Sequence, residues 1–101
     1  MKNVYFLYEG DEYLSSDSLI LMGVFDNNDD LKTAAKELIK QRAEEHMRYA
    51  LDNYTMDEDY TKEDVVNDLY DELLFNDQTS EGDTRYLIRE VQLNVLGEIY
   101  F

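Results

Sequence analysis

The sequence contains no cysteine, no proline and no tryptophan, and only 9 of its 101 residues are lysine or arginine. Without cysteine, the chain cannot form a disulfide framework, a thiolate nucleophile or a cysteine-bound zinc site. Without proline, no segment is marked as a rigid linker between domains. Because 44% of the residues are hydrophobic, enough for one modest core, we expect a single acidic domain over residues 1–101.

Long apolar runs are also missing from the sequence. The longest, from Val4 to Leu7 with Tyr8 beside it, falls far short of the ~20 residues that a membrane-spanning helix needs. Lys2 is the one positive charge near the start, so the sequence does not indicate a signal peptide. We therefore expect a cytoplasmic protein that does not contact a membrane.

Positive charge is scarce compared with negative charge. The 9 basic residues stand against 24 Asp and Glu, which gives a formal net charge of -15. A chain with this balance has no broad positive field to hold phosphate groups, so we do not expect it to bind nucleic acid directly. The imbalance instead favours a positively charged partner.

Three segments have the composition of β-strands. Residues 3–8 and 19–25 are rich in β-branched, aromatic and aliphatic side chains and are separated by turn-forming residues, which predicts a hairpin with a long loop. Alternating apolar residues predict a long final strand that starts near Leu87, with Gly97 as the site of a bulge.

Two segments between these strands have the pattern of helices. Apolar residues recur at the 3.6-residue period from about Asp30 to Asn53, which predicts one long helix. Thr61 and Asp64 have the spacing of a short capping box and predict a second helix of about 14 residues. The predicted fold is therefore α+β, in the order ββααβ, with two helices packed on one face of an antiparallel sheet.

The negative charge is concentrated in one part of the chain. Residues 55–83, which we call the acidic segment, hold eleven acidic residues and one basic residue, Lys62. This segment carries -10 of the net charge of -15 in less than a third of the chain. Such a patch is typical of a binding surface, although a solvated acidic face that only favours solubility has the same appearance.

Within the second predicted helix, like charges lie at contact spacing. Asp68 lies four residues from both Asp64 and Glu72, and each such pair destabilises a helix by ~0.2–0.5 kcal/mol. Replacing Asp64, Asp68, Asp71 and Glu72 by Asn and Gln is therefore expected to leave the stability unchanged or slightly higher, apart from a capping loss at Asp64. The residues predicted to contact a partner are Asp57, Glu58, Asp59, Tyr60, Glu63, Asp64, Asp68, Tyr70, Asp71 and Glu72.

In size, charge and compactness, and in the acidic run 57–72, the chain resembles the small phage-encoded DNA-mimic inhibitors, among them anti-CRISPR proteins and restriction inhibitors. The resemblance implies a non-catalytic protein, without a cofactor, that occupies the basic nucleic-acid-binding groove of a nuclease or effector. An acidic adaptor, which binds a protein without displacing its nucleic acid, is the alternative.

Calcium binding and catalysis are weaker interpretations. The loop that starts at Asp57 places oxygen ligands at the early positions of an EF-hand, but Lys62 occupies the sixth position, where the turn requires glycine. His46, the only histidine, is expected at the surface or boundary of the long helix rather than as a general base. We therefore expect neither a metal site nor an enzyme.

Overall fold

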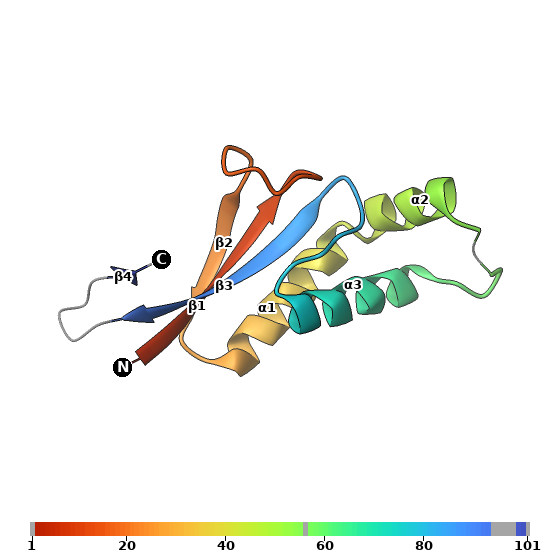
Figure 1. The fold of residues 1–101 in the computed structure, drawn as a ribbon. Helices are drawn as coiled ribbons and strands as arrows, with labels where there is room; N and C mark the ends of the chain where they lie inside the picture. Colours follow the sequence, from red (N-terminus) through yellow and green to blue (C-terminus); the bar gives the residue numbers. More distant parts are fainter. Residues whose placement is uncertain (1, 56, 94–98, 101) are drawn as a thin grey trace.

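The computed structural model describes residues 2–55, 57–93 and 99–100, and it confirms the α+β class (Figure 1). Two strands come first, three helices follow, and two further strands come last. In chain order the elements are β1 (Lys2–Gly10), β2 (Ile20–Phe25), α1 (Asn28–Gln41), α2 (Ala43–Asn53), α3 (Lys62–Asn76), β3 (Arg85–Leu93) and β4 (Ile99–Tyr100).

The strands form one antiparallel sheet in the order β2-β1-β3-β4. The predicted hairpin of β1 and β2 is present, and it has an irregularity where β2 carries one extra residue, Met22, opposite Leu7 and Tyr8. β1 also pairs with β3 along its whole length. β4 is a separate strand antiparallel to the end of β3, rather than a continuation of it, and the predicted bulge at Gly97 lies outside the described residues.

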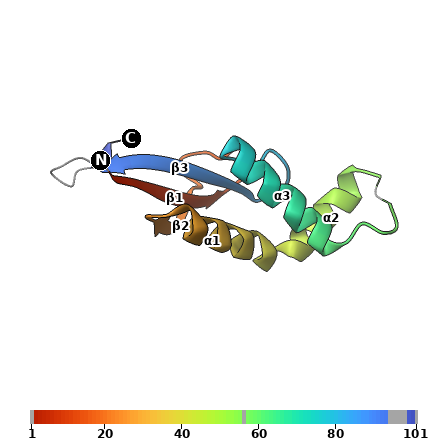
Figure 2. The same ribbon diagram turned by 90° about the horizontal axis from the view of Figure 1, so that it is seen from below.

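Two of the three helices, α1 and α3, pack against one face of the sheet. α1 lies along β1 and β2, whereas α3 packs against α1, α2 and β3 (Figures 1 and 2). The core between the two layers includes Leu7, Ile39, Leu73, Tyr86 and Ile88. Because side chains alternate along a strand, Val4, Phe6 and Val91 form a second, smaller cluster on the face away from the helices.

The prediction of one long helix from Asp30 to Asn53 is wrong, because the helix is broken at Arg42. The backbone N–H of Arg42 donates to the carbonyl of Ile39 at 3.1 Å, which tightens the last turn of α1, and α2 begins at the next residue. An unbroken helix of 24 residues would be about 36 Å long. The break allows both α1 and α2 to pack against the shorter α3, so the chain has three helices rather than the predicted two.

The N-terminus of α3 forms as its sequence predicts. The Thr61 hydroxyl accepts from the backbone N–H of Asp64 at 3.2 Å, and the Asp64 carboxylate accepts from the backbone N–H of Thr61 at 2.9 Å. This capping box satisfies two backbone donors that the first turn of a helix leaves unpaired. Among the described helices, none has the length and apolarity needed to cross a membrane.

Candidate functional site

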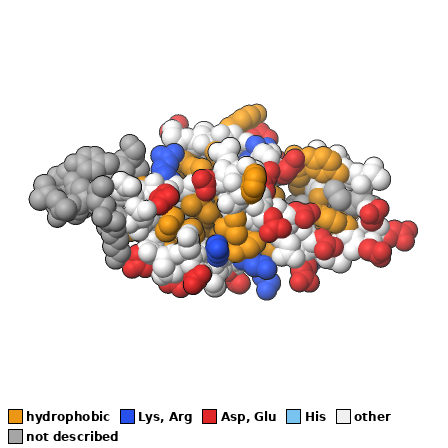
Figure 3. All heavy atoms as spheres, turned by 60° about the horizontal axis from the view of Figure 1, so that its bottom comes forward, with side chains coloured by type: hydrophobic (Ala, Val, Ile, Leu, Met, Phe, Trp, Pro, Cys, Tyr) orange, Lys and Arg blue, Asp and Glu red, His pale blue; other side chains and the backbone are white. Residues whose placement is uncertain are grey.

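The acidic segment consists of the connection from α2 to α3, then α3 itself, then the turn that leads to β3. Acidic side chains gather toward the end of the molecule that carries this connection (Figure 3). The ten residues predicted to contact a partner all lie on the connection or on α3. They divide into three groups, according to what their side chains contact.

The first group, which we call the bonded carboxylates, consists of Asp64, Asp68 and Glu72. Asp64 caps α3, and Asp68 accepts a hydrogen bond of 2.7 Å from the Tyr60 hydroxyl. Glu72 accepts from the backbone N–H and the hydroxyl of Ser80, at 2.9 and 2.6 Å. These carboxylates therefore hold the chain before and after α3 against the helix.

This geometry changes one expectation from the sequence, the effect of neutralising the acidic face of α3 on stability. The stripe of like charges at Asp64, Asp68 and Glu72 has a local explanation, because each carboxylate accepts hydrogen bonds from an adjacent turn. Charge-assisted hydrogen bonds are roughly twice as strong as neutral ones, so they offset the repulsion between neighbours on the helix. The stripe is therefore no argument for a partner.

Neutralising the bonded carboxylates (D64N, D68N and E72Q together) is expected to lower the free energy of unfolding by about 1–2 kcal/mol, because it weakens a helix cap and two tethers. The matched control, D57N, D59N and E63Q, removes the same charge, and the side chains that it replaces make no hydrogen bond to another described residue. Urea denaturation measures both. Equal stability of the two triple variants would contradict these assignments.

The second group, which we call the free carboxylates, is exposed to solvent. Within the part of the chain that the structure describes, their side chains make no hydrogen bond and no ion pair. Four of them lie on the approach to α3 or in its first turn, where the positive end of the helix dipole favours negative charge. The free carboxylates are Asp57, Glu58, Asp59, Glu63 and Asp71.

The two tyrosines of the predicted site form the third group, and both have packing roles. Tyr60 is half-buried against the core, and burial, followed by its hydrogen bond to Asp68, raises the pKa of its hydroxyl. Tyr70 is also half-buried against the core, and the Lys36 ammonium lies 5.4 Å from the centre of its ring. Burial raises the pKa of Tyr70, and the charge of Asp71 adds to this effect.

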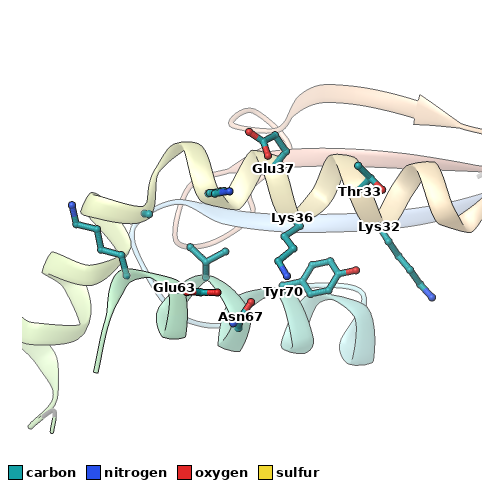
Figure 4. Close-up of a pocket in the computed structure, with 11 residues that line it drawn as sticks. Lys32, Thr33, Lys36, Glu37, Glu63, Asn67 and Tyr70 are labelled. Carbon is teal, nitrogen blue, oxygen red and sulfur yellow. The ribbon is translucent and has the colours of Figure 1, made fainter. Parts of the chain in front are cut away.

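A groove of about 670 Å³ lies between α1 and α3, and most of the lysines line it. The sequence did not predict this groove. Figure 4 shows Lys36 directed across this groove toward Tyr70. The spacing of four residues along α1 was the available signal, because it places side chains on one helix face. The lysines that line the groove are Lys32, Lys36, Lys40 and Lys62, and the acidic residues that line it are Glu37 and Glu63.

His46 is buried, so the prediction that it lies at the surface or boundary of a helix is wrong. Its Nε2 lies 2.8 Å from the Tyr86 hydroxyl, which is buried as well. Because the helix breaks at Arg42, the regular spacing of apolar residues along α1 does not determine which face of α2 is buried. Burial lowers the pKa of His46 and raises the pKa of Tyr86.

The low pKa of His46 predicts that the protein loses stability in mild acid. Near pH 6.5 the unfolded chain binds more proton at His46 than the folded chain does. The stability that this difference provides is therefore present above pH 6.5 and is lost as the pH falls below it. Glu9 and Glu45 oppose the shift and Arg42 reinforces it. The loss has an upper limit of about 1.4 kcal/mol per pH unit.

Thermal unfolding of wild type and His46→Gln between pH 7.5 and 5.5 measures this effect, because the variant keeps every other titrating group. We expect wild type to lose more stability over this range than the variant does. Parallel curves would contradict the prediction.

The described residues contain no group of three or more His, Asp or Glu side chains that could hold a metal ion. Fold and site together define a small acidic α+β protein whose free carboxylates extend from an ordered helix into the connection before it. Comparison with known proteins adds no family: no family model, curated protein or solved structure matches the chain.

Proposed function

We propose that this protein is a non-catalytic inhibitor, which places its acidic segment in the basic nucleic-acid-binding groove of a nuclease or another effector. The observation that carries the proposal is the group of five free carboxylates, Asp57, Glu58, Asp59, Glu63 and Asp71. They have no partner within the described chain, and they belong to the segment that holds -10 of the net charge of -15.

The scaffold beneath these charges also supports the proposal. The capping box at Asp64 and the hydrogen bond from Tyr60 to Asp68 hold the connection against α3, next to the free carboxylates. A binding surface that is ordered before it meets its partner loses less conformational entropy on binding. An ordered array of carboxylates is therefore a better competitor for a phosphate-binding groove than a flexible acidic tail of equal charge.

A charge-matched pair of variants tests whether the position of the charge matters. The free-carboxylate variant carries D57N, E58Q, D59N, E63Q and D71N. Its control carries E12Q, D17N, D29N, E37Q and D52N, which are exposed side chains on other parts of the molecule. Both variants replace three Asp and two Glu, which reduces the net charge from -15 to -10. Each also removes one acidic residue from the first turn of a helix: Glu63 of α3 in the free-carboxylate variant and Asp29 of α1 in the control.

Tagged wild type and both variants are used to capture proteins from nuclease-treated lysate, and the captured proteins are quantified by mass spectrometry. We expect wild type and the control to enrich the same nucleic-acid-binding protein, and the free-carboxylate variant to lose most of that enrichment. Electrostatic attraction at an exposed surface weakens with salt, so the enrichment should fall as salt rises. Equal enrichment by all three proteins would contradict the proposal.

A further inference from the structure

The outer edge of β2 is unusual in so highly charged a chain. Residues 18–25 contain no ionisable side chain, although 33% of the whole sequence is charged. β2 lies at the end of the sheet order, so β1 is its only strand neighbour among the described residues. Natural edge strands are usually protected by charge, by proline or by a bulge, and β2 has only the bulge at Met22.

Apolar side chains are exposed on both faces of this strand. Leu21 and Val24 lie opposite Tyr8 and Phe6, on the face away from the helices. Ile20 and Met22 lie on the other face, where Met22 lines a hollow against α1. These four side chains are between 43% and 61% exposed. A layer packed on one face of the sheet would cover only half of them, whereas a strand added at the edge would provide neighbours on both faces.

We infer that β2 pairs with β2 of a second copy of this chain, forming an antiparallel, two-fold symmetric dimer with one continuous sheet. The absence of charge on β2 favours a second copy of the chain as its partner. An uncharged strand offers no attraction to a basic partner, and it matches an equally uncharged strand. α1 covers the β2 side of the sheet and α3 packs on the β3 side. This pairing therefore places the two acidic segments away from the seam, the line along which the two β2 strands pair. A two-fold contact also closes on itself and does not propagate.

The pairing is expected to be weak and to depend on concentration. A seam of one six-residue strand, bent by a bulge, is smaller than the ~1,600 Å² of a standard interface. Each copy also carries a net charge of -15, and the resulting repulsion opposes association. Salt should therefore strengthen the dimer, which is opposite to its expected effect on binding of a basic partner, so this inference and the proposed function can fail separately.

Sedimentation velocity tests the inference on the whole chain, from about 10 µM to about 1 mM protein, which brackets weak interfaces. We expect the mean mass to rise from 12.0 kDa toward twice that value, and to rise further when salt increases from about 0.1 M to about 1 M. A monomer under all these conditions would overturn the inference, and so would a mass that grows without limit.

Single lysine substitutions locate the seam. L21K and V24K should each shift dimerisation to at least tenfold higher concentration. F75K makes the same charge change at a side chain of α3 that is 88% exposed, and it should dimerise like wild type. If F75K also loses the dimer, or if L21K and V24K keep it, the seam is not at β2.

Amide chemical shifts of wild type on dilution provide a test without substitution: the changes should centre on residues 20–25, and changes confined to other elements would refute the pairing.

Discussion

Replacing Leu73 by alanine is expected to lower the free energy of unfolding by about 2–5 kcal/mol, the range for truncating a fully buried leucine. Leu73 is 0% exposed and belongs to the core that α3 shares with the sheet. The truncation removes apolar area from the core and leaves a cavity, and both effects destabilise the folded state. Urea denaturation monitored by circular dichroism measures the change.

Phe75, two residues further along α3, provides the matched control because its side chain is exposed. Phe75→Ala should change the stability by no more than about 0.5 kcal/mol. The comparison also tests the rotation of α3 about its axis, and that rotation determines which carboxylates are exposed. Equal destabilisation by the two substitutions would contradict the orientation of the helix on which the acidic surface depends.

Replacing Arg42 by methionine is expected to cost about 1–3 kcal/mol, because it leaves the buried carboxylate of Glu9 without its ion-pair partner. The expected loss is below that of a fully buried pair because the Arg42 side chain is partly exposed. The Arg42 Nε–H donates a hydrogen bond to the Glu9 carboxylate, and this bond and the charge of Glu9 raise the pKa of Arg42. Thermal and urea unfolding measure the loss.

Two further variants distinguish the ion pair from a general effect of charge. Adding Glu9→Gln to Arg42→Met removes the unpaired carboxylate and should recover part of the lost stability. Arg48→Met removes an exposed positive charge on α2 and should have an effect within about 0.5 kcal/mol. If the double variant is no more stable than Arg42→Met, the contact between Glu9 and Arg42 does not contribute as described.

Local signals were sufficient to predict much of this fold. Thr61 and Asp64 mark the start of α3 because the capping box forms within four consecutive residues. The hairpin of β1 and β2 also follows from nearby residues, since β-branched and aromatic runs flank one loop. In each case the contacts that stabilise the element lie close together in the sequence, so a pattern in the sequence is enough to find them.

The features that could not be predicted depend on contacts between distant residues. No glycine or proline marks the helix break at Arg42, whose side chain pairs with Glu9, 33 residues earlier in the chain. The buried position of His46 depends on Tyr86, which is 40 residues away. The pattern of charges likewise does not separate bonded from free carboxylates, because Asp68 and Glu72 accept hydrogen bonds from turns outside α3.

The central claim is that the free carboxylates occupy a groove that otherwise holds nucleic acid, and competition measures this most directly. The captured partner is saturated with a fluorescent duplex, and the protein is added while anisotropy reports the bound duplex. Wild type and the matched control variant should displace the duplex, less effectively at higher salt, and the free-carboxylate variant should require at least tenfold more protein. If wild type binds the partner while the duplex stays bound, the protein is an adaptor, and the claim of charge mimicry is contradicted.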